Sequence, residues 1–464
     1  MVNDKILRLA LPSVVTNITV PLLGLVDTAV VGHMGRAEYI AAVAIGTTIF
    51  NMTYWLLGFL RMATTGITAQ AFGAEARGLV GETLKGSLRW ALGFAALLLV
   101  LQGPLLNFSL WLMKPNPEVA QLATEYFRTA IWGAPAMLSS YVLTGWFIGI
   151  QDTRTPMWMA ILQNLTNILC TLLLVFVLHL GVRGVALGTV VGIYMGVLFA
   201  ATRLTPLAPS LLARGRDYIR SLTTPLPNRA TGVFRESTEC GFGPTKGSES
   251  PLATEGRQGE SRSFLPSLGG VGGGLFLRTL CLVAVTVYFT TAGSRMGTLT
   301  LDANALLMQF FIVFSYFTDG LANAAEALSG ACVGRDDREE LRRVVLALFR
   351  WGAGLAIVFT VVYALCGGMF LSLLTNQPPV VAYARDYLPW VVAIPLVAFS
   401  AFVWDGVYIG MMRTTHMFVS MFVSMVVFFA LWLWLGPSNH ALWLSFLCYL
   451  GTRSLMQTVL FGRS

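Results

Sequence analysis

The sequence predicts an all-α integral membrane protein, with about twelve transmembrane helices arranged as two parallel six-helix repeats. The 464 residues are 55% hydrophobic and only 12% charged, and the mean hydropathy is +0.69, whereas a soluble domain carries about 25% charged residues. Apolar stretches of roughly 20 residues, the length that crosses a bilayer, recur along the chain. The two halves also resemble each other at a fixed offset. A lipid bilayer is therefore the expected surrounding of the chain.

Glycine, proline and charged residues separate these apolar stretches. Several stretches exceed 25 residues, so their helices must tilt, kink or project from the hydrocarbon layer. Within the first stretch, Pro12 and Pro21 are the candidate kink positions, because a proline inside a helix removes a backbone hydrogen bond. The predicted spans are 9–32, 41–71, 86–113, 121–149, 157–178, 184–204, 274–294, 299–332, 344–374, 382–411, 415–436 and 440–461.

Lysine and arginine in the connections predict the orientation. The net charge of +8 is not gathered in one run, so we expect no nucleic-acid partner. With the N-terminus placed in the cytoplasm, cytoplasmic segments hold 24 Lys and Arg, and the opposite segments hold six. Arg61 lies inside a span and is counted on neither side, while Arg278 and Arg453 are assigned to cytoplasmic segments. We therefore expect the protein in a plasma membrane or a bacterial inner membrane, with both termini in the cytoplasm.

The chain divides into three parts. Residues 1–204 are predicted to form an N-lobe of six spans, and residues 274–464 a C-lobe of six spans. Residues 205–273 are rich in Gly, Ser, Pro and Arg and poor in aliphatic residues. Such a segment buries too little apolar surface to offset the entropy of ordering, so we expect a flexible cytoplasmic linker there.

An internal repeat relates the two lobes. GFLRMATTGITAQAFGAEAR, residues 58–77, aligns without gaps on DGLANAAEALSGACVGRDDR, residues 319–338, at an offset of 261. At the same offset, the GxxxG segment 145–149 meets 406–410. We interpret these segments as close-packing helix contacts within each lobe. Six spans return the chain to the same side, so the repeats are parallel, and two such lobes suit alternating access to a central cavity.

Five ionisable residues are predicted well inside spans. Each costs about 3 kcal/mol to place at the bilayer centre and therefore needs a role. At the 261 offset every acid meets an uncharged residue, and Asp27 meets Tyr288. The functional hypothesis is that acids exchange a cation for substrate; the alternative is that each is fixed by a neighbouring arginine, hydroxyl or amide. Arg61 is expected to be a structural ion-pair partner. The five residues are Asp27, Arg61, Asp319, Glu326 and Asp405.

Four motifs together resemble the multidrug and toxic compound extrusion (MATE) family, and most closely its DinF branch. They are NITVPLLGLVDTAVVGH, FLRMATTGITAQAFGA, YFTDGLANAAEALSG and WDGVYIG. The resemblance covers the chain outside the linker. It implies a V-shaped pair of six-helix bundles and cation-coupled antiport of organic compounds.

The resemblance also implies a family position for each of the four acids. Asp27 matches the first-helix acid of the family, to which proton coupling is assigned. Asp319 and Glu326 match acids of helix 8 in the DinF branch, and Asp405 matches the acid of helix 10. Many members carry a further Asp in helix 5, where this chain has Thr171, so a relay through that second acid is in doubt.

Further polar residues are expected to support these acids. Asn164 and Asn167 remain in helix 5 as candidate partners of Asp27, and Tyr288 takes the position of Asp27 in the second half.

The predicted function is therefore a monomeric antiporter. It exports small organic compounds, cationic ones included, in exchange for H⁺ or Na⁺, and it needs no other cofactor and no metal site. A lipid or lipid-linked oligosaccharide flippase of the same superfamily is the alternative. It would need a strongly basic cavity, and Arg61 is the only arginine placed clearly within a span. A membrane enzyme is disfavoured, because the chain has neither an HExxH motif nor a Walker lysine.

Overall fold

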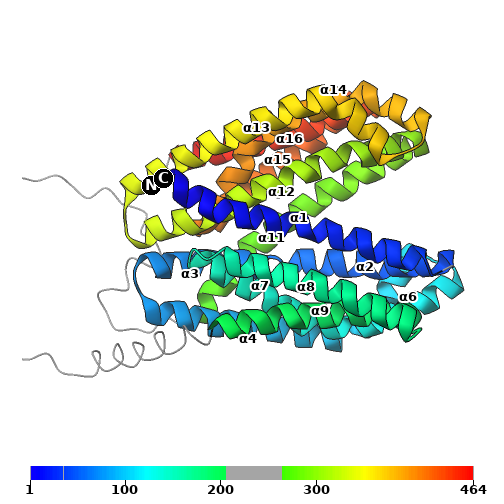
Figure 1. The fold of residues 1–464 in the computed structure, drawn as a ribbon. Helices are drawn as coiled ribbons and strands as arrows, with labels where there is room; N and C mark the ends of the chain where they lie inside the picture. The colour runs from blue at the N-terminus through cyan, green and yellow to red at the C-terminus, as the bar shows by residue number, and fades with distance from the viewer. Residues whose placement is uncertain (1, 35, 205–263, 463–464) are drawn as a thin grey trace, which may run out of the picture.

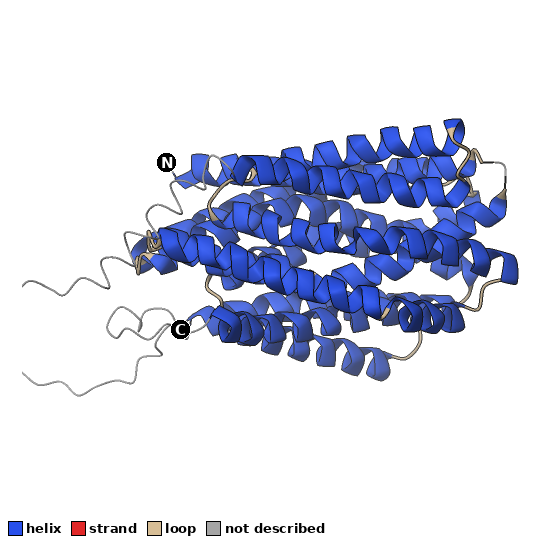
Figure 2. Ribbon diagram, turned by 90° about the horizontal axis from the view of Figure 1, so that it is seen from below, coloured by secondary structure: helices blue, strands red, loops and turns tan. Residues whose placement is uncertain are grey.

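The computed structural model describes residues 2–34, 36–204 and 264–462, which form a bundle of long helices (Figures 1 and 2). Most of the predicted linker, residues 205–263, lies outside this part of the chain.

In the first half, the helices are α1 (Val2–Gly32), α2 (Ala37–Leu57), α3 (Phe59–Gly73), α4 (Arg77–Val100), α5 (Gln102–Met113), α6 (Pro117–Ala130), the 3₁₀ turn η1 (Ile131–Gly133), α7 (Ala134–Gly149), α8 (Arg154–Leu172), the π-helical turn η2 (Leu173–Val177) and α9 (Gly181–Leu204). In the second half, they are α11 (Phe264–Arg295), α12 (Thr298–Gly334), α13 (Arg338–Leu374), α14 (Pro378–Gly410), α15 (Thr414–Leu435) and α16 (Asn439–Gly462).

These helices follow the order of the predicted spans. The pairs α2/α3 and α4/α5, the series α6–η1–α7 and the pair α8–η2 each correspond to one span. Within the described residues, nine helical stretches are long and apolar enough to cross a membrane. The predicted all-α membrane fold is confirmed.

The start of α11 differs from the prediction, which placed the lobe boundary at residue 274. The helix begins at Phe264 and includes the segment GGVGGG. Glycine costs about 1 kcal/mol in a helix relative to alanine, which is why the segment looked like linker. Tertiary packing overrides this propensity, because a Cβ atom at Gly272 would lie 3.0 Å from the Phe59 ring and one at Gly274 would lie 2.9 Å from Thr414 Oγ1.

The two halves form the arms of a V (Figure 1). Helices α2–α9 make up one arm and α12–α16 the other, while α1 and α11 lie between them. Helix α1 packs against both α12 and α8, and α11 packs against α15, α12 and α3. The described chain begins and ends at the same end of the molecule, where α3 also contacts α12. We call this the termini end.

The backbone repeats the sequence symmetry. Glu75 and Asp336, which lie 261 residues apart, both have φ of 56°. Gln151 and Met412, at the same offset, have φ of 64° and 56°. Positive φ is uncommon outside glycine, so the agreement shows that equivalent loops in the two halves have the same conformation.

The two GxxxG segments pack as predicted. A Cβ atom at Gly145 would collide with the Arg61 carbonyl oxygen, and one at Gly406 would collide with the Ala322 carbonyl oxygen. Arg61 and Ala322 are themselves related by the 261 offset. Each half therefore has one such glycine contact, and the two contacts hold the fourth span against the second at equivalent points.

Candidate functional site

Glu326 connects the two halves through an ion pair. It lies on α12, and its side chain is only 2% exposed. Arg61 on α3 donates from Nη1 to Glu326 Oε2 at 3.2 Å and from Nη2 to Oε1 at 3.3 Å. The same Nη1 donates to Asn323 Oδ1 at 3.1 Å. Arg61 therefore has an acidic partner in the structure, and Glu326 is held by charge-assisted hydrogen bonds across the halves.

Asp405 lies in a charged cluster within the second half. Its Oδ2 atom accepts hydrogen bonds from Arg278 on α11 and Arg453 on α16, and Gln457 Nε2 donates to Oδ1 at 2.7 Å. All three donors are at least nine-tenths buried. A carboxylate shared by two guanidiniums is held in its charged form, so Asp405 here neutralises buried arginines.

This cluster corrects two predictions. Arg278 and Arg453 were assigned to cytoplasmic segments, and Arg61 was taken as the only arginine within a span; both statements are wrong. Arg278 is buried midway along α11, because that helix begins at Phe264, and Arg453 is buried on α16. A flippase for a pyrophosphate-linked substrate is still disfavoured, because the four acids outnumber the three arginines and the interior carries no excess positive charge.

Asp319 lies on α12 beside the two charged groups. It is partly buried, and within the described chain no hydrogen bond or ion pair to it is found. Arg61 and Arg278 both act on it electrostatically, as do Glu326 and Asp405. Asp319 therefore lies between the interlobe ion pair and the Asp405 cluster without being fixed by either.

Asp27 is set apart from these groups. It lies on α1, and its Oδ1 atom is buried without a hydrogen-bond partner among the described residues. The buried phenol of Tyr126, on α6, is within electrostatic range of it. A buried, unpaired carboxylate oxygen is costly, and protonation or a small cation would relieve that cost.

The expected partners of Asp27 bond elsewhere. Asn164 Nδ2 donates to the Thr19 carbonyl oxygen of α1 at 2.9 Å, and Asn167 Nδ2 donates to Thr189 Oγ1 at 3.0 Å. The predicted bonds from these amides to Asp27 are absent from the described structure. Asn167 Oδ1 is also buried. Among the residues that the structure describes, neither this oxygen nor Asp27 Oδ1 has a donor.

Thr171, at the position of the helix-5 acid, lies at a close contact between two helices. It is fully buried on α8, and a Cβ atom at Gly188 of α9 would collide with its hydroxyl. The helices α8 and α9 therefore approach closely at this point, and a charged side chain in place of Thr171 would be buried between them.

Tyr288 and the two prolines have other surroundings. Tyr288 lies among Phe428, Phe429 and Trp432, and its hydroxyl accepts a hydrogen bond from Trp432 Nε1 at 2.9 Å. Helix α1 continues through the positions of Pro12 and Pro21 as one element. The kink predicted for these prolines stays a prediction.

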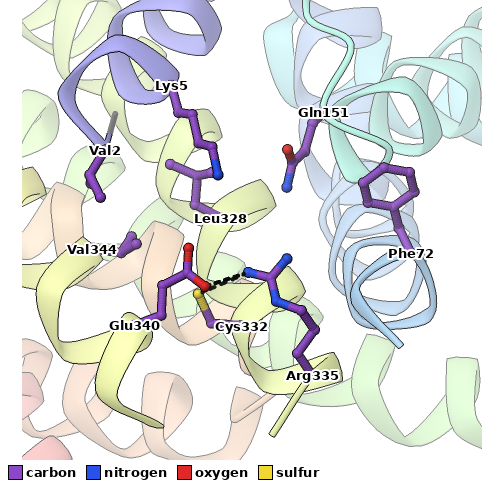
Figure 3. Close-up of a pocket in the computed structure, with 9 residues that line it drawn as sticks. All are labelled: Val2, Lys5, Phe72, Gln151, Leu328, Cys332, Arg335, Glu340 and Val344. Carbon is purple, nitrogen blue, oxygen red and sulfur yellow. Dashed lines mark hydrogen bonds and ion pairs between the residues drawn. The ribbon is translucent and has the colours of Figure 1, made fainter. Parts of the chain in front are cut away.

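A small pocket marks the boundary of the halves at the termini end (Figure 3). Its volume is about 70 Å³, whereas pockets for organic ligands are roughly 300–1,000 Å³. Lys5, Gln151 and Arg335 point toward its centre, and Arg335 is bridged to Glu340 at 2.9 Å. The complete lining is Val2, Lys5, Phe72, Gln151, Leu328, Cys332, Arg335, Glu340 and Val344. It is too small for an organic substrate.

Two related halves, with ionisable groups where they meet, are the architecture of an integral membrane transporter. The MatE family model matches residues 12–173 and 275–434, a large part of each half. The chain therefore belongs to the MATE family, and within it to the DinF-like branch.

Three relatives show the range of similarity. DNA damage-inducible protein F of Escherichia coli is 36% identical over 99% of this chain and 92% of its own length. Protein DETOXIFICATION 44, chloroplastic, of Arabidopsis thaliana is 25% identical over 88% of this chain and 72% of its own. Multidrug resistance protein MdtK of Klebsiella pneumoniae is 27% identical over 42% of this chain and 43% of its own.

Solved structures share the fold. A crystal structure of MATE in the bent conformation has a TM-score of 0.79 at 17% identity, and covers 100% of this chain and 95% of that one. A MOP superfamily transporter from Pyrococcus furiosus has a TM-score of 0.76 at 18% identity, with the same coverage. At this identity the likeness establishes the architecture alone.

Proposed function

We propose that this protein is a cation-coupled antiporter that exports small organic compounds, with Asp27 as the coupling acid and H⁺ as the coupling ion. Both termini lie in the cytoplasm, and the protein works as a monomer. Transport proceeds as the two arms rock and expose the space between them to each side of the membrane in turn.

The observation that carries the proposal is the contrast among the four acids. Asp405 and Glu326 are held by arginines, so neither is available to exchange a cation in this arrangement of the halves. Asp27 Oδ1 is buried and has no donor among the described residues. Its charged form is therefore less stabilised than those of Glu326 and Asp405, and a bound proton would remove the cost. Asp319, the fourth acid, has no hydrogen bond in the described structure but lies within electrostatic range of Arg61 and Arg278.

The charge balance supports a preference for organic cations. Arg61 pairs with Glu326, and Arg278 and Arg453 share Asp405. With the nearby Asp319, three acids balance the three arginines in number. Asp27 then adds one further negative charge in the first half. A pyrophosphate-linked substrate would instead need excess positive charge.

Several names among the relatives agree with this function. Multidrug resistance protein MdtK and the family of the solved MATE structures are named for multidrug resistance. We transfer that activity to this chain as part of the proposal, because it rests on the shared fold and family rather than on a measured substrate.

Transport in proteoliposomes tests the proposal. Purified protein is reconstituted, a pH or a Na⁺ gradient is imposed, and movement of ethidium and a panel of other organic cations is followed by fluorescence. We expect the pH gradient to drive transport, and the Na⁺ gradient at equal pH to drive none. If neither gradient moves any compound, the proposal is wrong; if only Na⁺ does, the coupling ion is wrong.

The acid is tested with a matched pair of variants. Asp27→Asn keeps the side-chain shape and removes the exchangeable proton, so gradient-driven transport should be lost. Asp302→Asn makes the same change at an exposed acid near the beginning of α12 and should transport like the wild type. Gradient-driven transport by Asp27→Asn at the wild-type rate would rule out this acid.

A further inference from the structure

We propose that Arg61, Asn323 and Glu326 form an interlobe lock, which keeps the two halves together at the termini end and is released when Glu326 takes up a proton from water. The three residues are positioning residues, because they act on the arrangement of the halves and not on the substrate. The inference rests on the alternating-access transport proposed above.

The lock joins two arms that must separate. Arg61 belongs to α3 of the first half, and Asn323 and Glu326 lie one turn apart on α12 of the second. Three hydrogen bonds of 3.1–3.3 Å connect them. Below this ion pair, toward the termini end, Gly73 and Gly334 each lie against the backbone of the opposite half. Opening this end moves α3 away from α12 and must break the ion pair.

The internal repeat makes this pair unusual. At the 261 offset, Arg61 corresponds to Ala322 and Glu326 to Thr65. The equivalent contact in the other direction therefore has no charged partner. The ion pair is an addition to one side of an otherwise symmetric interface, so the backbone packing of the repeat does not require it.

The charged and polar groups around Glu326 indicate how the interlobe lock could be released. The groups that face it are Arg61 and Thr65 from α3, Asp405 from α14, and Asn323 and Asp319 on its own helix. Arg278 of α11 and Tyr141 of α7 lie further out, beside Asp319 and Arg61 respectively. Asp405 is occupied by two other arginines. Once Arg61 withdraws, no second cation among the described residues is seen to act on Glu326.

A buried carboxylate that loses its only cationic partner is strongly disfavoured. A proton from the newly admitted water removes the charge, so the open arrangement is stabilised in the protonated form. Lower pH therefore favours opening at the termini end, and higher pH favours the closed, ion-paired arrangement.

The lock is tested by measuring the distance between the halves. Spin labels are placed at Arg77→Cys and Arg338→Cys, which are exposed, begin α4 and α13, and are equivalent in the repeat. The background replaces the native cysteines with alanine and is first checked for transport. Pulsed electron spin resonance then gives the ratio of short to long distances, without any substrate or gradient.

We expect the wild type to shift about tenfold toward long distances when the pH falls from 8 to 5. Glu326→Gln should show the long distance at both pH values. The exchanged variant Arg61→Glu with Glu326→Arg should recover the short distance at pH 8. A wild-type distribution that ignores pH, or a Glu326→Gln distribution that matches the wild type, overturns the proposal.

A matched control uses the exposed ion pair between Arg36 and Glu118, which joins the α1–α2 loop to α6 within the first half. Arg36→Gln should leave the distances and their pH dependence unchanged, and an equal shift in this variant would also overturn the proposal. Because no ion gradient is used, loss of coupling at Asp27 would leave this measurement intact. Failure of the lock and failure of the proposed function are therefore distinguishable.

Discussion

Gly73 and Gly334 occupy equivalent positions in the two halves, 261 residues apart, and each packs against the backbone of the other half. A Cβ atom at Gly73 would collide with Ala331, and one at Gly334 would collide with Gln70. Gln70 Nε2 also crosses the interface, donating to the Gly410 carbonyl oxygen at 2.9 Å. The halves therefore meet at the termini end through backbone contacts that no larger residue could make.

Substitution of Gly334 should prevent this closure. Gly334→Leu introduces overpacking, which costs about 1–3 kcal/mol, and roughly 1.4 kcal/mol changes the ratio of two arrangements tenfold. We expect ethidium transport in proteoliposomes to fall at least about tenfold, with the protein still folded. Gly354→Leu is the control, since nothing lies within 4 Å of a Cβ atom there. Equal transport by both variants would show that the contact is dispensable.

Removal of the Asp405 charge should destabilise the second half. Asp405→Asn leaves Arg278 and Arg453 buried without their counter-ion, and breaking such a buried pair costs about 3–5 kcal/mol. We expect a marked fall in the unfolding temperature of the purified protein in detergent. Asp302→Asn should leave it unchanged, and an unaltered unfolding temperature in Asp405→Asn would mean that the arginines have other partners.

Introduction of the family's helix-5 acid at position 171 should destabilise the protein. Thr171→Asp places a charge at a fully buried position against Gly188, at a cost of about 3 kcal/mol for a charge in the membrane interior. We expect low yield of folded protein, measured by size-exclusion chromatography, whereas Thr171→Ser should behave like the wild type. A well-folded Thr171→Asp with enhanced coupling would show that α8 and α9 separate readily.

Tyr288 should prove structural. Tyr288→Phe removes the acceptor for Trp432 Nε1, and a lost hydrogen bond of this kind costs about 1 kcal/mol. We expect a slightly lower unfolding temperature and an unchanged dependence of transport on the pH gradient. A changed ion dependence would instead make Tyr288 part of the coupling site, despite its aromatic surroundings.

The fold could be predicted from the sequence because hydropathy and repetition act at the scale of whole helices. The predicted spans follow the observed helices closely, and the 261 offset reappears in the backbone of Glu75 and Asp336. The start of α11 could not be predicted, because its glycines are poor helix formers and are accommodated only by contacts with Phe59 and Thr414.

The site was predicted less completely. The four acids stood out as charges inside spans, but their partners depend on how distant helices pack. Arg278 and Arg453 were counted as cytoplasmic charges, although both lie inside the predicted spans 274–294 and 440–461. A signal was present: FLRTLCLV and GTRSLMQTV place both arginines amid apolar residues, and Asp405 inside a span required a cation. The fixed partners of Asn164 and Asn167 carried no sequence signal.

The most direct test of the central claim is proton release on substrate binding. Ethidium is added to purified protein in weakly buffered detergent solution, and the protons released are compared with the ethidium bound. The account predicts release from the wild type, and ethidium binding without release from Asp27→Asn. Saturated binding without release from the wild type, or equal release from Asp27→Asn, would contradict exchange of a proton for substrate at Asp27.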